Sequence, residues 1–327
     1  MAGLFDPLRV GPLELRNRIV MPPMATQLST TKGEVTEGLI EHYARRAGGL
    51  GLLIVEHAYV TVGGKLSERQ LGIHDDALIP GLKKLVAKIH SLGTSIALQI
   101  NHGGRWTDKE ITGVEPVAPS PVTFEDGTSA RGLSPDEIEN LVEAFVEAAG
   151  RAVEAGFDAV EVHGAHGFLL NQFLSPLTNG RRDGYGGSLE NRMRFPLNVV
   201  QGVKGRIGEA PLLYRLGADD MKPGGFEIKE AKKFAQRLVE AGVNILDISG
   251  GLCGGSPAQL QGRQGYFMPL AEAMKDVVDV PVIGVGGITE PEFADRIVRE
   301  NRVDLVAIGR ALLKDPDWAI KAKRCLS

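Results

Sequence analysis

The chain has 327 residues, of which 43% are hydrophobic and 24% charged, and its net charge at neutral pH is −4. This composition is typical of a soluble globular protein and gives no electrostatic reason to expect a nucleic acid or an anionic membrane as a partner. The N-terminal residues lack the apolar core of a signal peptide, and no segment reaches the roughly 18 apolar residues of a membrane span. We therefore expect a cytoplasmic protein. The two cysteines, Cys253 and Cys325, are far apart, which argues against a disulfide framework and a zinc site.

A short sequence pattern occurs twice in the chain: "VEAGFDAVEV" begins at Val153 and "VEAGVNILDI" begins at Val239. Each reads as a helix end, a glycine able to take the left-handed cap conformation, and a short buried strand. Alternation of helix, glycine and apolar strand predicts parallel strands joined by helices. We expect eight strands, over Arg18–Met24, Leu52–Glu56, Ile96–Ile100, Ala159–Val162, Leu212–Leu216, Ile245–Ile248, Val282–Val285 and Leu305–Ile308.

A helical pattern follows each expected strand, and two helices have clear start signals. In "SPDEIENL" the predicted N-cap is Ser134, with Pro135 in the first turn and Glu137 completing a capping box. In "TEPEFADRI" Thr289 and Glu292 predict the same arrangement. Eight strand–helix units over roughly 300 residues fit an α/β fold of the closed (β/α)8 type, a TIM barrel. An open doubly wound sheet is the competing arrangement.

The connections between the elements are uneven. Long loops follow the third strand, over 101–133, and the fourth strand, which continues into "TNGRRDGYGGSLENR". In a barrel such loops lie on the C-terminal face, where active sites are built. No linker or low-complexity segment is visible, so we expect one domain over residues 1–327, a barrel with an N-terminal β-hairpin and these two long loops.

Two glycine features near the end of the chain suggest an anion site. Gly286 and Gly287 follow the seventh expected strand, and Gly309 and Arg310 follow the eighth. Glycines let backbone N–H groups approach an anion, the loops after strands seven and eight are the usual phosphate site of this barrel, and an arginine pairs well with phosphate. The alternative is that the glycines only serve tight turns.

Two polar residues stand in apolar strands. Gln99 is an uncharged donor and acceptor near the end of the third strand, suited to the edge of a planar heterocycle, although it could simply cap the strand. Arg215 ends an otherwise apolar strand, and a buried arginine there requires an anionic or carbonyl partner. No GxGxxG follows the first strand, which argues against a Rossmann nucleotide site.

Two histidines, His163 and His166, lie past the fourth strand in "HGAHG". A histidine near an apolar strand is often a core residue, but two at this spacing are suited to donate hydrogen bonds to one oxygen and stabilise charge that develops on it. A zinc pair is the rival hypothesis. It lacks a nearby third ligand, and the glycines disfavour the helix on which such pairs are built.

With these residues in view, the chain resembles the old yellow enzyme family of FMN-dependent ene reductases, and within it the thermophilic-like and dienoyl-CoA-reductase-like members. The resemblance covers nearly the whole chain through "LFDPLRVGPLELRNRIVMPPM", "HYARRAGGLGLLIVE", "LQINHGGR", "VEVHGAHGFLLNQFLSPLTNGRRDGYGGSLENRMRFP" and "VDLVAIGRALLKDP". It implies a TIM barrel that binds FMN and takes hydride from NADH or NADPH. The implied substrate is a small enone or enoyl compound, and the implied assembly is a homo-oligomer, a dimer or tetramer.

The resemblance also implies roles for single residues. Pro23, Met24 and Ala25 would lie along the flavin ring, and His57 would stand where the family usually has a small residue touching it. Gln99 would hold the pyrimidine edge, Arg215 would favour the reduced anionic flavin, and the phosphate would bind at the anion site already described. His163 and His166 would hold the carbonyl oxygen of the substrate while hydride adds to its β-carbon.

The sequence departs from the family at several positions. Phe168 stands where the family usually has a tyrosine that donates a proton to the α-carbon. Ala25 replaces a frequent cysteine and Gln27 a frequent tyrosine. We expect Gln27 and Phe168 in the substrate pocket together with the loop residues Tyr59 and Tyr266. The remaining proton donors are then Cys253, on the loop after the sixth strand, one of these tyrosines, or water. Neither an iron–sulfur motif nor a second nucleotide-binding half is expected in these residues.

Two alternatives stay open at this point. A flavin-dependent dehydrogenase, an isomerase or an oxygen-reducing NADH oxidase on the same scaffold would need no acid at position 168. A phosphate-binding barrel lyase or isomerase without flavin is the more distant alternative.

Overall fold

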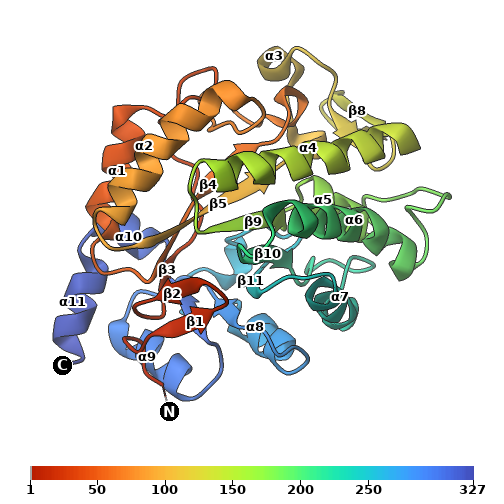
Figure 1. The fold of residues 1–327 in the computed structure, drawn as a ribbon. Helices are drawn as coiled ribbons and strands as arrows, with labels where there is room; N and C mark the ends of the chain where they lie inside the picture. The colour runs from red at the N-terminus through yellow and green to blue at the C-terminus, as the bar shows by residue number, and fades with distance from the viewer. Residues whose placement is uncertain (1) are drawn as a thin grey trace.

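The computed structural model describes residues 2–327. Eight parallel strands close a barrel in the order β10-β11-β12-β13-β3-β4-β5-β9 (Figure 1). The barrel strands are β3 Ile19–Met21, β4 Leu52–Tyr59, β5 Ser95–Asn101, β9 Ala159–Gly164, β10 Leu212–Gly217, β11 Ile245–Ser249, β12 Val282–Gly284 and β13 Leu305–Ala307. The predicted TIM barrel and all eight predicted strands are confirmed. The first was predicted too long, because Pro22 and Pro23 cannot donate to a strand ladder.

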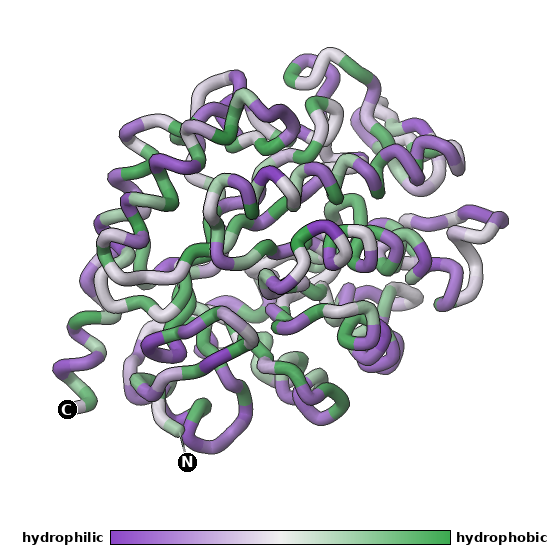
Figure 2. Tube along the Cα trace, viewed as in Figure 1, coloured by the Kyte–Doolittle hydropathy of each residue, from purple (hydrophilic) through white to green (hydrophobic). Residues whose placement is uncertain are grey.

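Helices connect the strands and cover the barrel, with polar residues along their outer turns and apolar residues concentrated on the central strands (Figure 2). The longer helices are α1 Glu37–Ala47, α2 Ile79–His90, α4 Pro135–Glu154, α6 Leu189–Ile207, α7 Ile228–Glu240, α8 Met268–Lys275, α9 Pro291–Arg299 and α11 Trp318–Cys325. Short helices are α3 Lys109–Thr112, α5 Leu169–Leu174 and α10 Arg310–Lys314. The long loop after β5 carries a small sheet of β6 Val117–Ala118, β7 Val122–Thr123 and β8 Ser129–Gly132.

The two predicted helix starts have different outcomes. Ser134 caps α4 and forms the full capping box with Glu137, as predicted. The prediction for Thr289 is wrong, because the N-cap of α9 is Glu290 and neither side chain caps the helix. Gln264 Oε1, from another loop, accepts from the backbone N–H groups of Thr289 and Glu290, at 2.8 and 3.0 Å, just before the first residue of the helix.

The barrel interior is apolar at its N-terminal end. An antiparallel hairpin, β1 Leu8–Val10 and β2 Leu13–Leu15, lies across this end, and its Leu13 and Leu15 belong to the same buried cluster as the first inward residues of the strands. Burial of this cluster leaves the C-terminal end of the barrel as the one able to hold polar groups.

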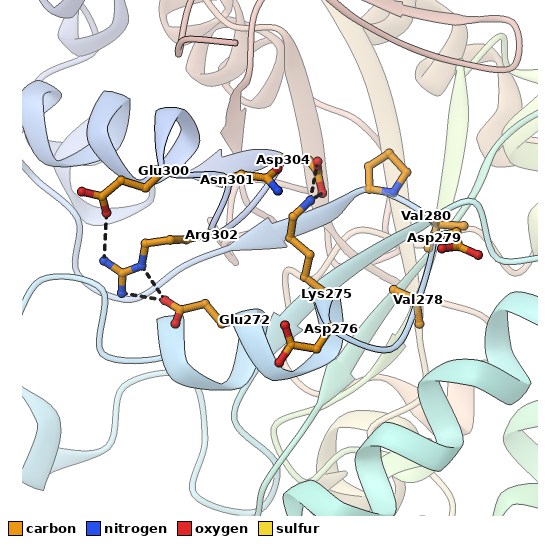
Figure 3. A pocket seen from close by; sticks show the side chains of 11 residues that line it. Glu272, Lys275, Asp276, Val278, Asp279, Val280, Glu300, Asn301, Arg302 and Asp304 are labelled. Atoms are coloured by element: carbon orange, nitrogen blue, oxygen red, sulfur yellow. Dashed lines mark hydrogen bonds and ion pairs between the residues drawn. The ribbon is translucent and has the colours of Figure 1, made fainter. Parts of the chain in front are cut away.

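A groove of about 500 Å³ lies at the N-terminal ends of β12 and β13. Two ion pairs in this groove are drawn in Figure 3: Lys275 lies 2.7 Å from Asp304, and Arg302 lies 2.6 Å from Glu272. Asp276 and Asp279 line the same groove outside these pairs, so acidic side chains outnumber basic ones there. The groove lies at the barrel end opposite the predicted site residues.

Candidate active site

A cavity of about 700 Å³ opens at the C-terminal face of the barrel. Its lining comes from the loops after β3, β11, β12 and β13 and from the end of β10. Among the residues predicted from the sequence, it includes Pro23, Met24, His166, Arg215, Tyr266, Gly287, Gly309 and Arg310. The structure thus brings together residues that are nearly 290 positions apart in the chain.

One end of the cavity gathers the glycines and the arginine that were expected to form an anion site. Gly286 and Gly287 have φ angles of +135° and +63°, which only glycine adopts without strain, and a Cβ on Gly286 would lie 2.6 Å from the Tyr266 nitrogen. Arg310 donates from its terminal nitrogens to Ser256 Oγ and Tyr266 Oη, at 3.2 Å each. These contacts hold the guanidinium beside Gly287 and leave further donors free for a phosphate.

Sequence reasoning missed three residues at this end. Ser256, Arg263 and Lys314 line the same cavity as Arg310. The loop "GGSPAQLQGRQGY" after β11 contained a usable signal, because its glycines and Arg263 are typical of loops that approach an anion.

The floor of the site is a buried polar layer inside the barrel, formed by Gln99, Glu161, Arg215 and Asp247. Gln99 Nε2 donates to Glu161 Oε1 at 2.8 Å, and Arg215 Nε pairs with Asp247 Oδ2 at 3.3 Å. Strand alternation points these residues inward, in line with the apolar Ala97, Ala159, Leu213 and Ile245 of the layer below.

Charge balance in this polar layer fixes one proton. The layer holds two carboxyls and one cation, so it is neutral when one carboxyl is protonated. Burial, and next the charge of Asp247, raise the pKa of Glu161 well above its ordinary value, while Arg215 opposes the rise that burial causes in the pKa of Asp247. Glu161 therefore carries the proton. Gln99 Oε1 has no hydrogen-bond partner among residues 2–327, which leaves it free as an acceptor.

Glu161 and Asp247 were not singled out from the sequence, although a signal was present. Residues two positions apart in a strand point to the same side, so Glu161 points inward like His163, and Asp247 points inward like Ile245. Each is an acidic residue within an otherwise apolar run. A buried carboxyl requires a polar partner in the barrel. Gln99 and Arg215, the polar residues of the neighbouring strands, had already been singled out from the sequence.

The predicted histidine pair is formed. His163 is the inward-facing residue next to the end of β9, and its ring centroid lies 5.0 Å from that of His166, with the ring planes at 87°. His166 has a φ of +59°, its nitrogen donates to the Gly250 carbonyl, and its Nε2 lies 2.8 Å from Ser249 Oγ. Burial, followed by nearby positive charge, lowers the pKa of both imidazoles well below the ordinary value. The rings are therefore neutral near pH 7.

Phe168 and His57 join the histidine pair. The Phe168 centroid lies 5.0 Å from His163 and 6.5 Å from His166, and the His57 centroid lies 5.6 Å from Phe168 and 6.2 Å from His163. Trp106, which sequence reasoning missed, lies beside the loop that carries His166 and Phe168, because a Cβ on Gly167 would lie 3.2 Å from Trp106 Nε1. The structure therefore gathers one aromatic cluster at the predicted substrate end.

The segment Pro23–Ala25 follows β3, and the residue after it, Thr26, is held by Glu56 of β4. Thr26 donates to the Glu56 carboxyl from its backbone nitrogen at 2.9 Å and from its hydroxyl at 2.5 Å. Gln27 follows with a φ of +60°, and its Nε2 donates to Ser67 Oγ at 2.7 Å. Glu56 thus fixes the direction of the segment that was predicted to contact the flavin.

Three residues predicted for the substrate pocket, or as proton donors, are turned elsewhere. The Tyr59 hydroxyl donates to the Lys32 carbonyl and its ring stacks on His74. The Tyr266 hydroxyl donates to the Gly255 carbonyl at the anion end. The Cys253 thiol donates to the Asp219 carbonyl at 3.4 Å, and burial raises the pKa of Cys253 to about 11. The expectation that Tyr59 and Tyr266 face the substrate end is not met.

Neither a metal-binding cluster nor a membrane-spanning helix is found within the residues that the structure describes. In residues 2–327 no group of three or more histidine, cysteine or acidic side chains is arranged to hold a metal ion. Over the same residues, no helix is long and apolar enough to cross a membrane.

Comparisons with known proteins agree with this geometry. The model of the NADH:flavin oxidoreductase / NADH oxidase family matches residues 3–327. The chain is 48% identical to an NADH oxidase of Thermoanaerobacter brockii over 98% of its own length and 50% of that protein. It is 40% identical to an NADPH dehydrogenase of Clostridium acetobutylicum over 98% of its length and 94% of that protein. The chain thus spans half the length of the first relative and nearly all of the second.

Solved structures show the same fold. A 2-naphthoyl-CoA reductase complex superimposes with a TM-score of 0.92 at 29% identity, over 99% of this chain and 52% of that one. The old yellow enzyme homologue from Zymomonas mobilis gives a TM-score of 0.88 at 28% identity, over 100% of this chain and 94% of that one. The fold, the arrangement of the site and the match of the family model over residues 3–327 agree, and the chain belongs to the NADH:flavin oxidoreductase / NADH oxidase family, the family of old yellow enzyme.

Proposed function

We propose that the chain is an FMN-dependent oxidoreductase that passes hydride from NADH or NADPH to the activated C=C bond of an α,β-unsaturated carbonyl compound. One observation carries this proposal: a single cavity is lined by Arg310 at its anion end, by Arg215 of the polar layer and by His166 of the neutral histidine pair. An anion-binding end, a heterocycle-binding floor and an oxyanion clamp are the three parts that this chemistry needs.

The residues present fit FMN. Gln99 Oε1 is a buried acceptor without a partner, and Arg215 is a buried cation whose Nε lacks a hydrogen bond, both among the described residues. At the other end Gly286 and Gly287 leave room that a Cβ would fill, and Arg310 lies beside them. Gln99 and Arg215 would hold the ring edge, and the glycines with Arg310 would hold the phosphate.

When bound, FMN supplies the hydride chemistry, accepting two electrons from the nicotinamide and delivering them to the acceptor. The chain's own residues orient the acceptor and stabilise its charge. His163 and His166 donate hydrogen bonds to the carbonyl oxygen, and these bonds strengthen as negative charge develops on it. Neutral imidazoles suit this role, because they donate without being titrated near pH 7.

Arg215 and the protonated Glu161 shape the charge under the ring. Arg215 is the only positively charged member of the buried polar layer, and it forms an ion pair with Asp247 of the same layer. Glu161 is neutral and accepts from Gln99, and Arg215 is the member of the layer that lines the cavity, so the layer places a positive charge at the cavity wall. Such a floor favours a bound ring that becomes negatively charged on reduction.

An anaerobic stopped-flow experiment tests the proposal. The protein is loaded with FMN and reduced with NADH or NADPH, and the reduced sample is mixed with cyclohexenone, a maleimide, an enoyl thioester or oxygen. The proposal expects reduction by a nicotinamide and reoxidation that is faster with an enone or enoyl compound than with oxygen. A protein that binds no FMN, or that is not reoxidised by any activated alkene, would contradict it.

A second function is favoured by a specific observation. Phe168 cannot donate a proton, and reduction of oxygen needs no acid at this position. The relative from Thermoanaerobacter brockii is named an NADH oxidase. If oxygen reoxidises the flavin faster than every alkene in the same experiment, NADH oxidation is the function and ene reduction a side reaction.

A further inference from the structure

Ene reduction leaves a chemical question open in this site. Hydride addition to the β-carbon produces an enolate, and the α-carbon must then receive a proton. The Phe168 ring cannot supply it, and Cys253, Tyr59 and Tyr266 donate to backbone carbonyls instead. A different group near Phe168 has to be considered.

His57 is placed next to Phe168 by an irregularity in β4. The register of β4 against β5 shifts between Val55 and Ala58, which pair with Leu98 and Ile100. Val55 and Ala58 both pack toward the helices, and regular alternation would leave one inward residue between them. Because of the bulge, two residues, Glu56 and His57, lie between them, and the ring of His57 turns toward the histidine pair.

Gln70 fixes the tautomer of His57. The backbone nitrogen of Leu66 donates to Gln70 Oε1 at 2.6 Å, which orients the amide. Gln70 Nε2 then donates to the His57 carbonyl at 2.9 Å and lies 2.8 Å from His57 Nδ1. Because an amide nitrogen can only donate, Nδ1 must accept, and the proton of a neutral ring must be on Nε2.

The second ring nitrogen of His57 has no partner within the protein. Nε2 makes none of the hydrogen bonds formed within residues 2–327, the residue is partly exposed, and this atom is not among the fully buried polar atoms. His57 is therefore a donor in a fixed orientation, 5.6 Å from Phe168 between ring centroids, with an N–H that no protein group occupies.

We propose that His57 is the catalytic acid of this site and gives its Nε2 proton to the α-carbon of the substrate, in place of a hydroxyl at position 168. The proposal rests on the proposed ene reduction. In this step the N–H bond of His57 breaks, a C–H bond forms at the α-carbon from the electron pair of the enolate, and the nitrogen keeps its own pair. The resulting imidazolate takes a proton from water.

Two contacts make a neutral imidazole a better acid here than in water. Gln70 donates to Nδ1 and so stabilises the negative ring that the transfer leaves. The positive charge of Arg215 does the same. Burial first, and then Arg215, lower the pKa of the His57 imidazolium to about 4, so the ring is neutral when substrate binds. Both contacts disfavour the cation and favour the anion.

The first test is spectroscopic and needs no turnover. Nitrogen NMR of the imidazoles in the flavin-free protein should show one ring held as the neutral Nε2–H tautomer between pH 5.5 and 8. His57→Gln should remove its signals, and Gln70→Leu should allow both tautomers. A His57 ring that titrates near its ordinary pKa of about 6.5, or that holds its proton on Nδ1, would overturn the proposal.

The second test follows the proton. FMN-loaded protein is reduced with NADPH or NADH and mixed in single turnover with 2-methylcyclohex-2-enone, whose methyl-bearing α-carbon becomes a stereocentre when it is protonated. The rate of flavin reduction is recorded separately, so that it does not enter the comparison. His57→Gln should slow reoxidation by about 100-fold, the usual contribution of a positioned acid, and should lower the enantiomeric excess at the α-carbon. His90→Gln, far from the site, is the matched control.

A rescue variant separates an acid from a packing residue. His57→Gln combined with Phe168→Tyr places a hydroxyl in the same cluster and should restore both the reoxidation rate and the enantiomeric excess. Unchanged rate and stereochemistry in His57→Gln would refute the role of His57 and leave the proposed function intact. Wild-type protein that no enone or maleimide reoxidises would instead refute the proposed function, and the role of His57 with it.

Discussion

The protonated Glu161 can be tested by replacing it with its neutral isostere. Glu161→Gln keeps an acceptor for Gln99 Nε2, the 2.8 Å hydrogen bond that orients this amide. It removes a carboxyl that burial and Asp247 keep protonated in the folded protein and that ionises near 4.5 in the unfolded chain. We therefore expect Glu161→Gln to be more stable than the wild type at neutral pH.

The magnitude follows from linkage. The folded-state pKa of Glu161 is raised, so the unfolded chain releases this proton first as the pH rises, and the wild type loses stability above about pH 4.5. One pH unit corresponds to about 1.4 kcal/mol while the folded carboxyl stays protonated. Between pH 6 and pH 8 the advantage of Glu161→Gln should grow by up to about 2.7 kcal/mol.

The assay is urea unfolding of the flavin-free protein at pH 5, 6, 7 and 8. Glu143→Gln, on the exposed face of α4, is the matched control and should give a difference that does not grow with pH. Glu161→Leu should be destabilised by about 1–3 kcal/mol, because the buried Gln99 amide loses its acceptor. A difference between Glu161→Gln and wild type that stays constant from pH 6 to pH 8 would show that Glu161 is ionised in the folded protein.

Three further outcomes are expected. Burial lowers the pKa of His57 and of His102 to about 4. The contribution of these neutral rings to stability is therefore complete above about pH 6.5 and is lost at about 1.4 kcal/mol per pH unit for each ring as the pH falls toward 4. Urea unfolding between pH 4 and pH 7 measures this loss. Ser249→Ala removes the partner of His166 Nε2 and should slow reoxidation by an enone about tenfold, with nicotinamide oxidation unchanged in stopped flow. Arg310→Ala should weaken FMN binding about 10- to 100-fold in titration calorimetry, with riboflavin affinity unchanged, because only FMN carries the phosphate.

Local patterns in the sequence were sufficient for the fold. Glycines before several of the buried strands, such as Gly156 and Gly242, and apolar runs of four to seven residues predicted all eight strands of the barrel. The wrong helix start accompanies a tertiary contact: Thr289 and Glu292 match the capping pattern, but Gln264 on another loop accepts from the backbone N–H groups of Thr289 and Glu290, just before α9. A pattern within one segment cannot reveal a contact with a residue 25 positions away.

The candidate site divides in the same way. The residues of the anion end were found from the sequence, because glycines and an adjacent arginine follow the last two strands, and Gly287, Gly309 and Arg310 line one cavity. The directions of the Tyr59 and Tyr266 side chains were not predictable. Tyr59, expected on a loop, is the last residue of β4, and it is held by Lys32 on the loop after β3 and by His74 on the loop after β4. Membership of a rim loop therefore did not fix the direction of a side chain.

The bulge in β4 shows how a change of one residue in register connects stability with chemistry. Regular alternation from Leu52 would turn His57 toward the helices, and the bulge turns it toward the histidine pair. A bulge leaves backbone groups without ladder partners, and here side chains satisfy them. The Glu56 nitrogen donates to the Tyr43 hydroxyl at 2.8 Å, and Gln70 Nε2 donates to the His57 carbonyl. The amide that satisfies the bulge is thus the same amide that fixes the proton of His57 on Nε2, so the backbone irregularity and the donor depend on one side chain.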